Sequence, residues 1–195
     1  MTTAAKNSNA MESSIDESWR LWGTLVVLLV LVIVIGKKAS AEGVTLKDTA
    51  GYTHPMLALE MNARAADVMF TVWNDETKDS LKTALHWDYV FLFVYPAAVA
   101  VSCFIAGGFL HRAGIVPFNY SLIIICLQLI APVLDAVENY ALLKVLSGPI
   151  VSPWPELARW CAIGKFSLVL LGIGYALLLG GGVWLLVNTS RMWSR

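Results

Sequence analysis

A few charged side chains lie inside long apolar runs of this chain, where a charge is costly. Asp135 and Glu138 share one such run, and Lys165 lies in the next. A charged side chain in hydrocarbon costs about 2.5–3.5 kcal/mol on insertion scales, so residues of this kind usually pair with one another or bind a substrate or ion. Two carboxylates and one ammonium suit a proton, a cation or an amine headgroup. Paired carboxylates also support acid–base chemistry when their environments separate their pKa values.

Helical spacing brings further polar side chains to these three. Asp88 and Tyr95 lie seven residues apart, and Asp135 and Asn139 lie four apart, so each pair shares one helix face. Counting 1.5 Å per residue from the ends of the apolar runs places several of these residues about 12 Å from the same membrane surface. We therefore predict one polar cluster in a single leaflet, made of Asp88, Tyr95, Asp135, Glu138, Asn139 and Lys165.

Four apolar segments must position this cluster. The 195 residues are 57% hydrophobic and 14% charged, whereas a soluble domain carries about 25% charged residues. Each segment is close to or above the ~20 residues that span a bilayer. The predicted fold is therefore an all-α integral membrane bundle, residues 19–187, with four transmembrane helices at about 19–36, 87–110, 119–146 and 157–187.

Small residues repeat every four positions in the last segment, at Gly172, Ala176 and Gly180. Small side chains at this spacing let two helix backbones approach closely in a membrane, so we expect these residues at a helix–helix contact. The first segment has no comparable polar or small-residue face. It is therefore expected at the periphery of the bundle, against lipid.

The remaining segments are polar. Residues 1–18 contain few large apolar side chains and are predicted to be disordered, and residues 188–195 form a polar tail. Between the first two spans, residues 37–86 form an extramembrane segment with an amphipathic helical pattern. Its apolar positions are Ala63, Ala66, Met69, Phe70 and Trp73. We expect this segment to lie at a membrane surface.

Four crossings would put both ends of the chain on one side of the membrane. Basic residues are almost evenly divided between the two sides, but the short connection at Arg112 and two arginines in the tail favour cytoplasmic termini. Ala39-Ser40-Ala41 has the small residues of a signal-peptidase site. Because Lys37 and Lys38 precede it and the polar leader is long, we expect the first segment to be a retained anchor.

The order of the polar motifs resembles that of a group of small bacterial multi-pass membrane proteins with no assigned activity. The chain carries Asp-x-x-Phe at Asp88–Phe91, Asp-x-x-Glu-Asn at Asp135–Asn139 and Lys-Phe at Lys165–Phe166. The likeness covers about residues 56–175. It implies an architecture only. The expected location of the chain is a bacterial inner membrane.

Three functions fit these observations. The preferred one is a non-enzymatic accessory or lipid-binding component, with the charged cluster buried in one leaflet. A small transporter or an ion- or proton-binding protein would use Asp135, Glu138 and Lys165 directly. A membrane-embedded, lipid-modifying enzyme is the third.

Sequence motifs favour the first function over an enzyme. The chain has no Ser-His-Asp signature, HExxH, P-loop or Cys-x-x-Cys motif, so we expect no catalytic residues, metal or cofactor. Its formal net charge of zero gives no electrostatic case for a nucleic-acid partner. The expected partners are membrane lipids, with a membrane-protein partner or a second copy of the chain as alternatives.

Overall fold

The computed structural model describes residues 19–37 and 55–186, and every regular element within these ranges is helical. Four helices are long and apolar enough to cross a membrane: Trp19–Lys37, Asp75–Arg112, Phe118–Ser147 and Trp154–Leu186. The predicted all-α fold with four such helices is confirmed for this part of the chain. The leader 1–18, the Ala39-Ser40-Ala41 stretch and the tail 188–195 lie outside it.

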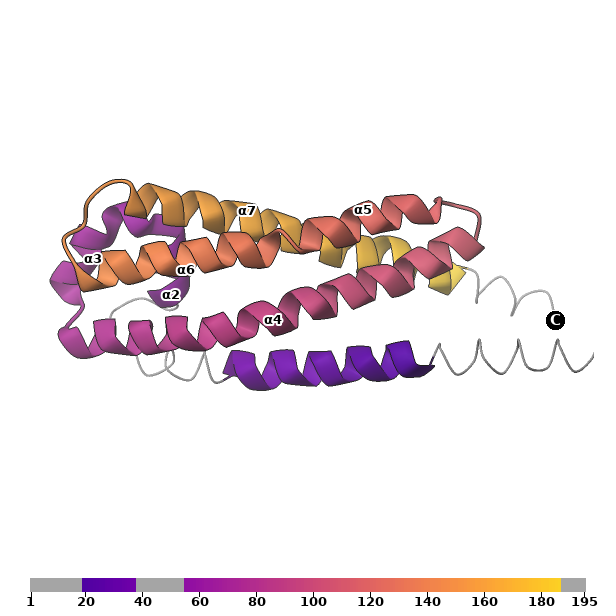
Figure 1. Ribbon diagram of the computed structural model, residues 1–195, viewed down its shortest axis with the longest axis horizontal. Coiled ribbons are helices and arrows are strands. Elements are labelled where there is room, and N and C mark those ends of the chain that lie inside the picture. Colours follow the sequence, from indigo (N-terminus) through magenta and orange to yellow (C-terminus); the bar gives the residue numbers. More distant parts are fainter. Residues whose placement is uncertain (1–18, 38–54, 187–195) are drawn as a thin grey trace, which may run out of the picture.

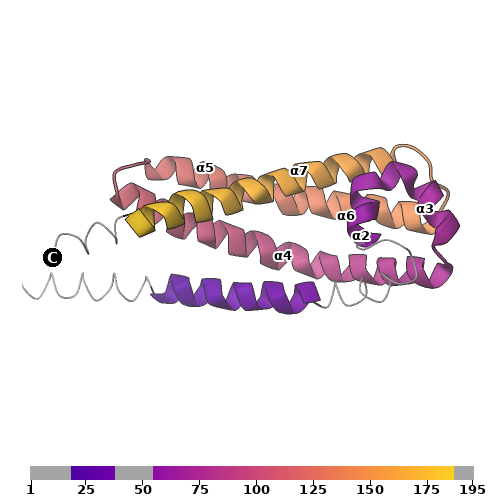
Figure 2. The ribbon, with the colours of Figure 1, turned by 180° about the vertical axis from the view of Figure 1, so that it is seen from behind.

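The long helices run alternately in opposite directions along one elongated bundle (Figures 1 and 2). α4 (Asp75–Arg112) runs away from the end that carries α2 and α3, and α5 (Phe118–Gln128) and α6 (Ala131–Ser147) return to it. α7 (Trp154–Gly174) and the π-helix η2 (Tyr175–Gly181) then run beside α6 and α4. In both views the helix Trp19–Lys37 lies along α4.

Two of the predicted spans are not uniform α-helices. Residues 129–130 form a turn between α5 and α6, and Pro132 follows in the first turn of α6. Proline is tolerated there because the first N–H groups of a helix have no intrahelical acceptor. The last span changes from α-helix to π-helix over Tyr175–Gly181 and continues to Leu186. A π-helical turn is rare and often occurs at a functional site.

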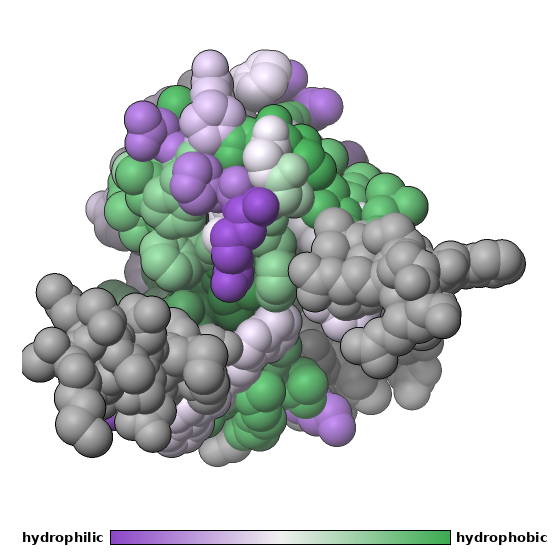
Figure 3. All heavy atoms as spheres, turned by 90° about the vertical axis from the view of Figure 1, so that its right-hand side faces the viewer, coloured by the Kyte–Doolittle hydropathy of each residue, from purple (hydrophilic) through white to green (hydrophobic). Residues whose placement is uncertain are grey.

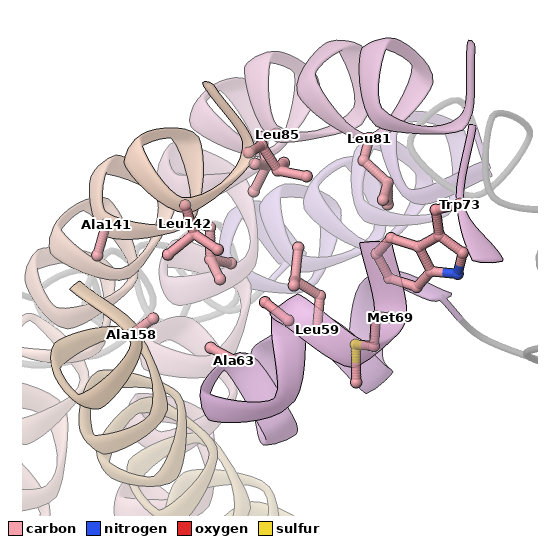
Figure 4. Close-up of a cluster of buried hydrophobic side chains, with 12 residues drawn as sticks. Leu59, Ala63, Met69, Trp73, Leu81, Leu85, Ala141, Leu142 and Ala158 are labelled. Atoms are coloured by element: carbon pink, nitrogen blue, oxygen red, sulfur yellow. The ribbon is translucent and has the colours of Figure 1, made fainter. Parts of the chain in front are cut away.

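The segment before α4 packs on the end of the bundle. α2 (Pro55–Asn62), the 3-10 turn η1 (Ala63–Ala65) and α3 (Ala66–Val72) bend around this end. Figure 4 shows their apolar side chains meeting those of α4, α6 and α7 in one cluster, which includes Leu59, Ala63, Met69, Trp73, Leu81, Leu85, Ala141, Leu142 and Ala158. The amphipathic pattern thus identified helices, and the apolar face of these helices packs on the bundle itself. Their expected place at a membrane surface stays a prediction.

α4 begins well before the span predicted from the sequence. The side chain of Asn74 accepts a hydrogen bond from the backbone N–H of Thr77 at 2.8 Å, which satisfies one of the unpaired donors at the helix start. The helix has 38 residues, so it is roughly 57 Å long at 1.5 Å per residue. Residues 75–86, assigned to the extramembrane segment, therefore continue directly into the predicted span 87–110.

Large apolar side chains cover the flanks of the bundle. Phe93 on α4 is 82% exposed, and Leu178 on η2 is 76% exposed. The end-on view in Figure 3 shows hydrophobic residues around a smaller group of hydrophilic ones. The helix Trp19–Lys37 also exposes most of its apolar residues. An apolar surface this extensive is typical of a protein that contacts lipid or a partner.

Candidate functional site

Lys165, on α7, lies at the centre of a buried polar cluster. Its ammonium Nζ lies 2.7 Å from Oδ1 of Asp135 and 2.9 Å from Oε2 of Glu138. Both acids are on α6, three residues apart, so one face of α6 presents both to α7. All three residues are buried. Because these ion pairs are shielded from solvent, removing one partner leaves an uncompensated buried charge.

Hydrogen bonds connect α4 to the same face of α6. The hydroxyl of Tyr95 donates to Oδ2 of Asp135 at 3.0 Å. The side-chain amide of Asn139 donates to Oδ2 of Asp88 at 2.7 Å. The six residues selected by helical spacing therefore lie together, on three different helices.

Glu60 on α2 also belongs to this cluster, and the sequence reasoning missed it. Its Oε1 lies 3.7 Å from Nζ of Lys165, and the residue is only 8% exposed. The sequence did contain a signal for it. Leu59 and Ala63 are four residues apart, so the apolar face of the amphipathic pattern extends back to Leu59, and Glu60 is the next residue. Since that segment was expected on a membrane surface, its carboxyl was not considered near the intramembrane charges.

Carboxyl groups outnumber cations in the cluster. Glu60, Asp88, Asp135 and Glu138 surround the single ammonium of Lys165. Burial raises the pKa of Glu60 to about 7, and the nearby ammonium of Lys165 opposes this rise. At neutral pH the Glu60 carboxyl is therefore only partly ionised.

Some acceptor atoms of the cluster are not satisfied by the described residues. Oε1 of Glu138 and Oδ1 of Asn139 have no hydrogen-bond partner there, although both residues are fully buried. Most buried polar atoms have a partner, and one without a partner costs about 1–3 kcal/mol. The cluster thus has unused capacity to accept hydrogen bonds.

A cavity of about 600 Å³ adjoins the cluster, between the helix Trp19–Lys37, α4 and α7. One end is lined by Glu60, Asp88, Tyr95, Asp135 and Lys165. The rest is lined almost entirely by apolar side chains: Leu25, Leu29, Val32, Phe91, Ala98, Val99, Phe166, Val169, Ile173, Ala176 and Leu177. A mostly apolar cavity with a few converging polar groups is the usual form of a small-molecule site.

The apolar part of the cavity is long. Ser102 also lines it, and α4 rises by roughly 21 Å between Asp88 and Ser102 at 1.5 Å per residue. A second cavity of about 340 Å³ adjoins the first toward Trp22 and Trp184. Four residues line both cavities: Leu25, Ser102, Ala176 and Leu177. The space beside the cluster is therefore an elongated apolar groove along the bundle.

The small-residue stripe lies where α7 and η2 approach their neighbours. A Cβ atom on Gly172 would lie 2.6 Å from Val99, and one on Gly180 would overlap Ala106 of α4. Ala176, between them, lines both cavities. The stripe thus provides two close helix contacts and leaves space between them.

The chemistry available at the site is the recognition of charge and hydrogen-bond donors. Within residues 19–37 and 55–186, no group of three or more His, Cys, Asp or Glu side chains is arranged to hold a metal ion. Ser102, a hydroxyl lining the cavity, donates to the backbone oxygen of Ala98 at 2.8 Å and lies far along α4 from the carboxylates.

Comparison with protein-family models gives no match, and comparisons with curated proteins and with solved structures give none either. The motif resemblance to small bacterial membrane proteins thus remains a prediction.

Proposed function

We propose that this chain is an integral membrane protein that binds an amphiphile, with the apolar chain in the 600 Å³ cavity and the polar headgroup at the carboxylate cluster. Four helices long enough to cross the roughly 30 Å hydrocarbon core support insertion into a bilayer. The exposed apolar flanks support it as well, since water would solvate them poorly.

The cavity carries this proposal. A purely structural ion-pair network would need only the contacts of Lys165 with Asp135 and Glu138. Here the network instead forms the charged end of a long apolar space. The two chemistries are arranged as they are in an amphiphile, in which a polar head is joined to an aliphatic chain.

Polar contacts elsewhere in the bundle favour binding over transport. The amide of Gln128 donates to the backbone oxygen of Leu168 at 2.9 Å, and the hydroxyls of Ser121 and Tyr175 are hydrogen-bonded to each other at 2.7 Å. The amide N–H group of Gln128 and both hydroxyls thus have partners nearby, whereas Oε1 of Gln128 has none among the described residues. In the described residues, these side chains do not extend the carboxylate cluster into a polar path along the bundle.

The proposal includes an arrangement of the chain in the membrane. Residues 19–187 would form the transmembrane domain, with the polar ends 1–18 and 188–195 on one side and the folded part of 37–86 on the other. A bacterial inner membrane is the proposed location. Exposed Arg112 in the short α4–α5 connection supports cytoplasmic termini. Lipid is the proposed ligand, and an accessory role beside another membrane protein is compatible with it.

Photo-crosslinking tests the proposed site. Membranes containing the full chain would be incubated with hexadecanol carrying a diazirine in its chain, and the labelled peptides would be identified by mass spectrometry. We expect enriched labelling of peptides from 19–37, α4 and α7. Val169→Trp, which fills the cavity, should reduce this labelling several-fold, whereas Leu170→Trp, on the exposed side of α7, should not. Equal labelling of all exposed flanks in every variant would contradict the proposal.

A further inference from the structure

We infer that the headgroup bound at the carboxylate cluster is a primary ammonium, so that the ligand is a long-chain amine or a lipid that presents one. This inference rests on the proposed amphiphile site and names the chemical class of its headgroup. Three observations support it: the charge of the cavity's polar end, the unused acceptor positions of Glu60, and the lack, among the described lining residues, of a basic side chain free to bind an anionic head.

The charge of the polar end favours a cation. Three carboxyl groups, those of Glu60, Asp88 and Asp135, line the cavity with one ammonium, that of Lys165. Glu138, behind them, also contacts Lys165 at 2.9 Å. One lysine cannot balance four carboxyl groups. A second ammonium in the cavity would compensate part of the excess negative charge and would be attracted strongly in a site of low dielectric constant.

Glu60 provides the most direct acceptor for this second ammonium. Only 8% of its surface is exposed, and it lines the cavity. Among the described residues its polar contact is the ion pair with Lys165 at 3.7 Å, which is longer than a hydrogen bond. By contrast, Lys165 lies within 3.0 Å of Asp135 and of Glu138. The Glu60 carboxylate therefore lies at the cavity wall with acceptor positions unused.

A primary ammonium matches this wall better than other headgroups do. It donates three hydrogen bonds, and Glu60, Asp88 and Asp135 all present carboxylate oxygens along the same end. A quaternary ammonium would carry the charge without the donors. A small inorganic cation would not explain the apolar groove of about 600 Å³ that continues from the carboxylates.

Anionic heads are disfavoured by the same residues. Lys165 is the only basic side chain among the described residues that line the cavity, and three carboxylates already contact it. A phosphate or a carboxylate placed there would face like charges without a basic partner, which costs binding free energy. A fatty acid is thus the expected poor ligand, and a fatty alcohol of equal length is the neutral reference.

Native mass spectrometry of the full chain in a neutral detergent tests this inference. Hexadecylamine, hexadecanol and hexadecanoate would be added separately at pH 7, where the amine is protonated. Charge-assisted hydrogen bonds should give the amine about a tenfold advantage over the alcohol, with the fatty acid weaker than both. Glu60→Gln should reduce the advantage of the amine to about twofold or less. Glu76→Gln, an exposed carboxyl on α4, is the matched control.

The outcomes distinguish the inference about the headgroup from the proposal of an amphiphile site. If the wild-type chain retains all three compounds equally, and Val169→Trp prevents their retention, the amphiphile site stands and the inference about the headgroup is wrong. If the wild-type chain retains none of them above a Val169→Trp background, the proposed function is wrong. The comparison of the three compounds on the wild-type chain does not depend on any variant. If Glu60→Gln fails to fold, Asp88→Asn provides the same test of the headgroup.

Discussion

Lys165 and Asp135 are thirty residues apart in the sequence, and their side chains form a buried ion pair of 2.7 Å between α7 and α6. The other carboxylate oxygen of Asp135 accepts the Tyr95 hydroxyl of α4 at 3.0 Å. This one carboxylate therefore connects three of the long helices. It also lines the cavity, so helix packing and the proposed headgroup site depend on the same group.

Replacing Lys165 should destabilise the bundle. Lys165→Met leaves Asp135 and Glu138 buried without their ammonium, and breaking a buried ion pair in this way costs about 3–5 kcal/mol. We expect a clearly lower Tm for the purified variant in detergent at pH 7, measured by the loss of helical circular dichroism. A Tm equal to that of the wild-type chain would contradict a structural role for the pair.

The double variant Lys165→Met/Glu138→Gln tests which acid shares the cation. Neutralising Glu138 removes one of the uncompensated charges, so part of the lost Tm should return, while Asp135 still lacks its partner. Each substitution is made in the Lys165→Met background. If Asp135→Asn restores stability there and Glu138→Gln does not, Lys165 pairs with Asp135 alone.

Much of the helical architecture follows from sequence periodicity and length. Apolar runs near 20 residues predict four long helices, and spacings of four and seven residues place Asp135 beside Asn139 and Asp88 beside Tyr95 on common helix faces. These relationships are local, so they can be found in a single sequence. Counting residues from the ends of the apolar runs placed Lys165 and the acids of α6 at the same depth in the membrane, which predicted that they lie near one another.

The position of α2 could not be predicted in the same way. An amphipathic pattern shows that one helix face is covered, but the covering surface can be a membrane or another helix. Leu59 is fully buried against the bundle, and its neighbour Glu60 thereby reaches Lys165. The cavity was equally hidden, because it depends on side chains from several helices that are distant in the sequence.

Gly172 should be sensitive to the smallest possible enlargement. A Cβ atom there would lie 2.6 Å from Val99 and 2.7 Å from Gln128, so Gly172→Ala must displace both side chains or shift the helix. Overpacking of this kind costs about 1–3 kcal/mol, and we expect a lower Tm in detergent. Gly182→Ala is the control, since no atom lies within 4 Å of its added Cβ. Equal effects at both positions would rule out the close contact.

Glu60 predicts a definite pH dependence of stability. Its pKa is raised from 4.5 to about 7, chiefly by burial and against the opposing ammonium of Lys165. Asp88 of α4 and Asp135 and Glu138 of α6 are also nearby. Between these values the unfolded chain binds fewer protons than the folded chain, so the free energy of unfolding falls as pH rises.

Comparing wild type with Glu60→Gln isolates this contribution. The variant cannot ionise at this position. From pH 5 to pH 8 the free energy of unfolding of the wild-type chain should therefore fall by up to about 3 kcal/mol relative to that of the variant. Thermal unfolding of both chains in one detergent across this range measures the difference. A wild-type chain that gains stability relative to the variant as pH rises would show that the ionised carboxylate is stabilised by its surroundings.

Membrane insertion can be tested with the native cysteines. Cys126 lies on α5, eight residues from its start and exposed on the bundle surface, whereas Cys103 and Cys161 are buried. If α5 crosses a bilayer, Cys126 should react slowly with a membrane-impermeant maleimide in opened membranes and quickly after solubilisation in dodecyl sulfate. Glu76→Cys, near the start of the long helix α4, should react quickly in both conditions. Fast labelling of Cys126 in membranes would exclude this insertion.

The central claim is that the cavity between the helix Trp19–Lys37, α4 and α7 holds an amphiphile. The most direct measurement is the amount and identity of lipid that remains bound to the full chain after purification from membranes and extensive detergent washing. The account predicts about one amphiphile per wild-type chain and per Leu170→Trp chain, and a several-fold loss in Val169→Trp. Equal lipid content in folded Val169→Trp and wild-type protein, or none in either, would contradict it.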